Sequence, residues 1–437
     1  MRKIEGKWFN VNANNKKDGI EGIVEFKENK INVNFKNENI FAGSTYRAKI
    51  NDKYFTIWFN RHFFNGNGNA ALAIESAEKI DLSIEKTVIK EIILNVPNLE
   101  YWLGGDEIKE IDGYLYPRDI IEVQENKIYI QTYLYEELSG VAQTKSMINV
   151  ILDEPISIGK AEEYISCILK FFAILIGRID HLEEIYLKLD NVEEYVTYYT
   201  TMNNSHMTQY DIPIISTRTS YKYLSNDIKF YYSKWCEFYQ SYKIVIDHYF
   251  KLHATLPLTI EDMFLAWCNI YDGYWIHGNE IDRKSKKFEK EVKKLLKEEE
   301  IYDLFTKLFS EYNLKFEPWK VAQKIKKEIE TEKSLGEVLK VIFKDNYDLI
   351  SKNINDMKCG NEEINEETIY GYINRTRNFY THLKQDTSKI LNYNQIIESN
   401  KLFHCTFIII LLKQIGFEGD ELKRAVKNDW IISFHII

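Results

Sequence analysis

The strongest constraint on the fold is a change in the spacing of apolar residues near residue 156. Before it, apolar and polar residues alternate in short stretches such as GIVEF, INVNF and KYFTIW, separated by turns rich in Asn and Gly. Alternation with a period of two residues is typical of strands with one buried face. After it, apolar residues recur every three or four positions, as in AEEYISCILKFFAILIG, which predicts helices. The two patterns in succession predict an α+β fold.

The predicted organisation has three parts, because a chain of 437 residues is too long for one compact core. We expect a β-rich N-terminal domain over residues 1–155. Residues 156–225 combine the first helical pattern with two further strand patterns, IYLKL and EYVTYYT, and we expect a small α/β annex of the N-terminal domain there. Residues 226–437 carry helical patterns throughout and are predicted to form an all-α bundle.

Charge and cysteine content narrow the function classes. The formal net charge is -9, so the protein has no overall positive field and must bind any polyanion locally. Its five cysteines are scattered and include no C-x-x-C pair, which argues against a disulfide framework and against a zinc knuckle. We therefore expect a protein of a reducing compartment.

Two apolar runs, Ile165 to Gly177 and Leu402 to Gly416, are shorter than the roughly 20 residues that span a bilayer. Each is interrupted by polar residues, namely Lys170 in the first run and His404 and Lys413 in the second. Both are predicted to be buried helices, and the N-terminus has no signal-peptide pattern. These features predict a cytoplasmic protein without a membrane partner.

Familiar catalytic signatures are missing from the sequence. It contains no Walker loop, no G-x-G-x-x-G after a strand, no H-E-x-x-H and no nucleophile elbow. The sequence therefore does not support nucleotide hydrolysis, dinucleotide redox chemistry or zinc-dependent hydrolysis. We expect no cofactor and no metal.

The most informative segment is NEETIYGYINRTRNFYTHLKQDTSK, residues 365–389. Asn365 is a suitable cap for a helix, and Glu366 and Glu367 would complement the helix dipole in its first turn. Apolar residues with a spacing of three and four predict a core-facing stripe: Ile369, Tyr372, Ile373, Thr376, Phe379, Tyr380 and Leu383. Other positions are polar: Arg375, Arg377, Asn378, His382 and Gln385.

The string Arg377-Asn378-x-x-x-His382 resembles the R-N-x-x-x-H signature of the HEPN superfamily, whose active members are metal-independent endoribonucleases. The resemblance implies that a ribose 2'-hydroxyl attacks the adjacent phosphorus. His382 would act as general base or acid, and Arg377 would stabilise charge on the phosphate. Asn378 would orient the imidazole or bind a phosphate oxygen. A solvated helix face is the alternative interpretation of these residues.

The order of segments along the chain resembles that of ApeA-like anti-phage proteins. In the helical half the series is TIEDMFLAWCNIYDGYWIHGN, EKSLGEVLKVIF, the motif helix and KLFHCTFIIILLKQIG; in the first half it is GKWFNV, GIVEF, INVNF, KYFTIW and VPNLEYWLG. The resemblance implies defence by abortive infection and a phage-derived trigger at the N-terminal domain. It also implies a homodimer or a higher homo-oligomer through the HEPN bundle, because HEPN relatives pair two motif helices and this helix supplies a single histidine to a reaction that needs an acid and a base.

Several interpretations stay open in the sequence. Where HEPN relatives often place a glutamate on an earlier helix, this chain has Asp272, which is either a partner of the motif arginine or an ordinary solvated aspartate. Arg375 is suited either to an RNA phosphate or to a surface salt bridge. Residues 283–297 are strongly basic, and either an RNA-binding or a salt-bridged helix fits them. For the whole protein, the alternative to a nuclease is a catalytically inactive HEPN scaffold that binds RNA or a protein partner.

Overall fold

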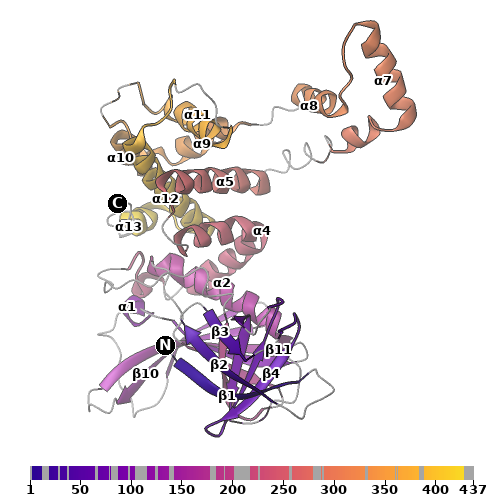
Figure 1. Cartoon of the computed structure of the whole chain (residues 1–437). Coiled ribbons are helices and arrows are strands. Elements are labelled where there is room, and N and C mark those ends of the chain that lie inside the picture. The colour runs from indigo at the N-terminus through magenta and orange to yellow at the C-terminus, as the bar shows by residue number, and fades with distance from the viewer. Residues whose placement is uncertain are drawn as a thin grey trace. The chain divides into compact units, whose positions relative to one another are not determined.

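The computed structural model confirms the α+β fold class, with an antiparallel sheet in the first half of the chain and helices in the second (Figure 1). The residues that it describes are 2–11, 19–27, 30–36, 39–63, 67–77, 79, 87–96, 99–103, 116–123, 126–136, 142–177, 184–190, 192–200, 217–224, 227–254, 258–278, 287, 290–329, 333–359, 361, 363–382 and 388–427.

Thirteen strands among the described residues form one sheet. They are β1 (Arg2–Asn10), β2 (Ile20–Lys27), β3 (Lys30–Phe35), β4 (Thr45–Ile50), β5 (Lys53–Trp58), β6 (Asn67–Ala70), β7 (Leu72–Ser76), β8 (Val88–Asn95), β9 (Tyr116–Val123), β10 (Asn126–Glu136), β11 (Ala142–Ser157), β12 (Glu184–Leu189) and β13 (Tyr195–Thr200). Their order across the sheet is β6-β3-β2-β1-β4-β5-β7-β13-β12-β8-β11-β10-β9, and neighbouring strands are antiparallel.

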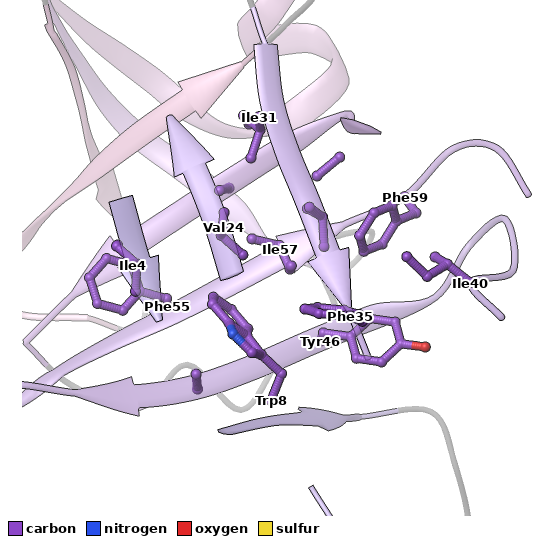
Figure 2. Packing of buried hydrophobic residues seen from close by; sticks show 14 of the residues in the cluster. Ile4, Trp8, Val24, Ile31, Phe35, Ile40, Tyr46, Phe55, Ile57 and Phe59 are labelled. Atoms are coloured by element: carbon purple, nitrogen blue, oxygen red, sulfur yellow. The ribbon is translucent and has the colours of Figure 1, made fainter. Parts of the chain in front are cut away.

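The first seven strands enclose an aromatic core, shown in Figure 2. The alternation that predicted strands also sets this burial: in β3, Ile31, Val33 and Phe35 are buried while the residues between them are not. Trp8 and Phe35 are fully buried, and their ring centroids lie 5.8 Å apart. The polar residues at intervening positions face outward, so the same strands supply one buried face and one face toward solvent.

The change of period occurs where the sequence predicted it. The strand β11 ends at Ser157, and helix α2 (Ile158–Ile176) begins at the next residue. The Ser157 side chain accepts a hydrogen bond from the amide of Lys160, which caps the helix start. One face of α2 packs across β8 and β11, so the first predicted apolar run is a buried helix.

The predicted annex, residues 156–225, supplies α2 and the two expected strands, β12 and β13. Both strands lie inside the sheet, between β7 and β8, where they join the strands that precede them in the chain. The annex is thus an integral part of the sheet.

The carboxyl end of α2 is capped by a segment that follows β13. Gly177 has a left-handed backbone with φ of 86°, which ends the helix. The amides of Arg218 and Thr219 donate to the carbonyls of Ile176 and Leu175, and the buried Arg218 guanidinium donates to the Ile174 carbonyl. Three helix carbonyls that would lack partners are satisfied in this way.

The described helices are α1 (Leu99–Leu103), α2, α3 (Tyr221–Leu224), α4 (Ile228–Ala254), α5 (Ile260–Gly278), α7 (Glu299–Glu311), α8 (Pro318–Ile329), α9 (Leu335–Asp345), α10 (Tyr347–Asp356), α11 (Ile369–His382), α12 (Tyr393–Gln414) and α13 (Gly419–Lys427). By length and composition α12 is apolar enough to cross a membrane, but 83% of its apolar window is buried. This burial is typical of the core helix of a soluble protein.

Contacts divide the described chain into two compact units. One draws on residues 1–240, 250–257 and 408–435, and the other on residues 241–249 and 258–407. Helices α4 and α12 each contribute residues to both units. All residues of the R-N-x-x-x-H motif and Asp272 belong to the second unit.

Candidate active site

Three helices of the second unit, α5, α9 and α11, pack against one another and build the surroundings of the motif (Figure 1). The apolar stripe predicted for α11 is largely confirmed: Ile369, Tyr372, Ile373 and Thr376 are buried. Phe379 and Tyr380 are half-buried, and Leu383 lies outside the described residues. Burial of this stripe determines which side of α11 is left for polar side chains.

The helix α9 approaches α11 closely because a glycine lies at the contact. A Cβ placed on Gly336 would lie 3.2 Å from the Tyr370 carbonyl oxygen. A capping box fixes the start of α9, since the Ser334 hydroxyl accepts from the Glu337 amide and the Glu337 carboxylate accepts from the Ser334 amide. The cap and the close contact at Gly336 together restrain the start of α9 against α11.

The segment leading into α11 is capped as predicted. The Asn365 side-chain oxygen accepts hydrogen bonds from the amides of Glu367, at 2.9 Å, and Thr368, at 3.1 Å. Glu366 and Glu367 were predicted in the first turn of the helix, but they lie in the turn that precedes Ile369, where α11 begins.

A buried threonine attaches α11 to the segment just before α12. The Thr376 hydroxyl donates to the Tyr372 carbonyl and accepts from the Leu391 amide, both at 2.8 Å. The two hydrogen bonds saturate a hydroxyl that is fully buried. They restrain the helix at the residue immediately before the motif arginine.

The structure brings Asp272 of α5 and Arg377 of α11 together. The Arg377 Nη2 atom lies 3.6 Å from Asp272 Oδ2, and the side chains are 28% and 31% exposed. The Arg377 Nη1 atom also donates to Asn378 Oδ1 at 3.2 Å. One side of the guanidinium is thus held by protein groups, while the part left exposed is available to an anion.

A buried thiol lies beneath this ion pair. Cys268, one helical turn before Asp272, is buried, and its pKa is raised by burial and further by the Asp272 charge, while the Arg377 charge opposes the shift. The thiol therefore stays protonated at neutral pH. It adds no charge beside Asp272 and gives the ion pair a low-dielectric side on which the attraction is weakly screened.

His382 and Arg375 are exposed, and His382 is the last residue of α11. On an ideal helix His382 lies about 7.5 Å along the axis from Arg377 and about 140° around it. A single copy of α11 therefore presents the arginine and the histidine on different sides. Gln385, predicted on the same polar surface, lies outside the described residues.

Comparison with known families assigns the region that contains these residues. A family model described as Apea-like HEPN matches residues 265–421. This region is an Apea-like HEPN domain. HEPN domains are in general ribonucleases, so the match supports a ribonuclease or defence role in broad terms. No curated protein and no solved structure gave a significant match to the chain.

The matched HEPN domain contains Asp272 and the three motif residues, while the N-terminal domain lies outside the match. The resemblance of the first half of the chain to ApeA-like proteins stays a prediction. Among the residues that the structure describes, no group of three or more His, Cys, Asp or Glu side chains has the arrangement of a metal site.

Two features of the HEPN domain were not identified from the sequence. Trp275, one turn after Asp272 on α5, is half-buried, and the Lys333 ammonium lies 4.5 Å from its ring centroid. Thr376 was expected only to be buried, and its link to Leu391 was missed. The signal for Thr376 was a hydroxyl within an otherwise apolar stripe, which requires a partner.

Other predicted residues have structural roles. His404 is buried and packs against the rings of Tyr249 and Trp267. In the basic segment, Lys287 and Glu291 form an i, i+4 pair at 4.0 Å, which supports the salt-bridged interpretation at that point. Residues 283–286, 288 and 289 lie outside the described residues.

Two substitutions should separate the groups that support the fold from those that form the site. Thr376→Val leaves the buried Leu391 amide without an acceptor and should lower the free energy of unfolding by about 1–3 kcal/mol. Asp272→Asn breaks a partly exposed ion pair and should cost less than about 1 kcal/mol. Urea denaturation of both variants beside the parental protein measures the difference. Equal destabilisation would show that the ion pair is a structural element.

Proposed function

We propose that the protein is a metal-independent endoribonuclease of anti-phage defence, acting in the cytoplasm through its HEPN domain. The observation that carries the proposal is the ion pair between Asp272 and Arg377 within the matched domain. It holds the motif arginine, still partly exposed, beside Asn378 on the same helix as His382. A positioned guanidinium and an exposed imidazole both suit an RNA phosphodiester, although one copy of α11 presents them on different sides.

In the proposed reaction the 2'-oxygen of a ribose attacks the adjacent phosphorus. An imidazole takes the 2'-hydroxyl proton, the O2'–P bond forms and the P–O5' bond breaks, and the leaving 5'-oxygen receives a proton from a second acid. His382 supplies the base or the acid. The products carry a 2',3'-cyclic phosphate and a 5'-hydroxyl.

Arg377 stabilises the charge that develops on the phosphate oxygens during attack. Its guanidinium stays charged at every relevant pH and donates in a fork that matches two oxygens. Asp272 acts on the reaction through Arg377 and is therefore a positioning residue. Asn378 accepts from Arg377 through its side-chain oxygen, which leaves its amide nitrogen to donate to a phosphate oxygen or to the imidazole.

We further propose that two copies of the chain form one cleft. The reaction needs a base and an acid, and α11 offers a single histidine. A two-fold contact between copies of α11 would bring two sets of Arg377 and His382 around one phosphate. Paired arginines would also concentrate positive charge, so that a protein with a net charge of -9 binds RNA locally.

The N-terminal domain is proposed to sense a phage-derived trigger and to control the nuclease. The alternative function is an inactive HEPN scaffold for RNA or a protein partner. It predicts that the parental protein binds RNA or a protein partner and cleaves no RNA.

The first prediction concerns the motif. His382→Ala should lower cleavage of RNA by about 10² to 10⁴, and Arg377→Ala should lower it by about 10² to 10³. Gel analysis of total RNA with purified, folded variants measures the loss, and cellular toxicity should fall in parallel. His248→Ala, which changes an exposed histidine of α4, is the matched control and should cleave at the parental rate.

Further variants test whether Asp272 positions Arg377 and whether Arg375 binds RNA. Asp272→Asn should lower kcat, and Asp272→Glu should recover part of it by restoring the carboxylate. Arg375→Ala should raise the KM for RNA and leave kcat near the parental value. Parental cleavage by His382→Ala would refute the assigned site, whereas RNA binding by a parental protein that never cleaves would favour the scaffold.

The second prediction concerns metal ions and product ends. Because a ribose hydroxyl is the proposed nucleophile and an imidazole the proposed base, EDTA should leave the cleavage rate unchanged. End labelling before and after phosphatase treatment should identify 2',3'-cyclic phosphate and 5'-hydroxyl ends. Strict dependence on Mg²⁺ with 5'-phosphate products would contradict the mechanism.

The third prediction concerns assembly. If two copies share a cleft, activity per chain should fall on dilution over the concentration range in which mass photometry records dimer dissociation. A monomer that retains full activity would exclude the shared cleft and would require a second acid or base elsewhere in the chain.

A further inference from the structure

Two cysteines outside the HEPN match lie in direct contact. Cys167 on α2 and Cys236 on α4 share a hydrogen bond between their side chains, and both are half-buried free thiols. They lie 69 positions apart in the sequence, in the same compact unit. The proposed nuclease uses neither of them.

The packing of α2 against α4 holds the two thiols opposite each other. The Trp235 indole donates to the Cys167 carbonyl at 2.9 Å, immediately beside Cys236. One turn along α2, the Phe171 ring lies 5.1 Å from the Tyr232 ring and 6.5 Å from the Trp235 ring. Contacts along both helices thus fix the approach of the sulfur atoms.

The hydrogen bonds make the two sulfurs unequal. Cys236 accepts from the Cys167 thiol and from the Tyr232 hydroxyl, and the bond from Cys167 in particular lowers the pKa of Cys236. The same bond to Cys236, together with burial, raises the pKa of Cys167. Cys236 is therefore the better nucleophile of the pair, and Cys167 lies in place to resolve an oxidised Cys236.

We propose that Cys167 and Cys236 are a redox-sensitive thiol pair that a small hydroperoxide converts into an intramolecular disulfide. The Cys236 thiolate attacks one peroxide oxygen, the O–O bond breaks, and hydroxide leaves with the thiol proton as water. The Cys167 sulfur then attacks the Cys236 sulfenic acid, forms the S–S bond and expels a second water. With hydrogen peroxide, two thiols and one peroxide give one disulfide and two waters.

The disulfide would covalently join α2, which packs on the sheet, to α4. Closing a loop of this length restricts the unfolded chain and should raise the midpoint of thermal unfolding. In a reducing compartment the pair would stay as thiols until oxidant rises, and a thiol reductant would reverse the bond. The pair is thus a modification site independent of the proposed nuclease.

The test is oxidation of the full-length protein with hydrogen peroxide, alkylation of remaining thiols, digestion and mass spectrometry. We expect a peptide pair joined through Cys167 and Cys236, a higher thermal midpoint, and reversal of both by dithiothreitol. Cys359→Ser, which removes the exposed cysteine, should give the same cross-link. Cys167→Ser should leave a sulfenic acid at Cys236 that dimedone captures.

The proposal is overturned if the parental protein keeps both thiols alkylatable while Cys359 is oxidised. It is also overturned if Cys236 proceeds to a sulfinic acid with no cross-link to Cys167. Because the cross-link is measured in the parental protein, a variant that folds poorly does not change the outcome of the test.

Discussion

The candidate site depends on the burial of one face of α11. Four of its side chains are enclosed where α5 and α9 pack against it, and the fully buried Thr376 hydroxyl bonds to Leu391, two residues before α12 begins. Rotation of α11 would bury charged residues and expose this stripe, which would cost several kcal/mol of hydrophobic free energy. Consequently the residue after Thr376, the motif arginine, is directed by core packing.

The ion pair between Asp272 and Arg377 contributes little to the stability of the fold, but it restricts the position of the Arg377 side chain. A partly exposed carboxylate and guanidinium 3.6 Å apart contribute at most about 1 kcal/mol. The pair nevertheless restricts a long side chain with many rotamers to one region of the surface, and pre-organisation of this kind lowers the entropy lost on binding a phosphate. The protonated Cys268 beneath it keeps that region free of a competing negative charge.

Patterns within short stretches of the sequence predicted those features that depend on interactions between residues close together in the chain. The change of period near residue 156, the cap at Asn365 and the buried stripe of α11 follow from spacing and from side-chain chemistry. The insertion of β12 and β13 between β7 and β8 was not predictable in this way, because strand order depends on contacts between distant segments. The same limit applies to Arg218 at the end of α2 and to the Cys167–Cys236 contact. For Asp272, the resemblance to HEPN relatives left two interpretations open, and only the packing of α5 against α11 brings it to Arg377.

The central claim is that the ribose 2'-hydroxyl is the nucleophile at a site formed by Arg377 and His382. The most direct measurement uses an RNA oligonucleotide that the parental protein cleaves, and a second oligonucleotide with a single 2'-deoxyribose on the 5' side of the scissile phosphate. We predict that the parental protein cleaves the first oligonucleotide at that phosphate and does not cleave the second there. The His382→Ala protein, which keeps Arg377, should bind both oligonucleotides similarly. Cleavage of the deoxy-substituted phosphate at a comparable rate would contradict the account, because the nucleophile would then be water.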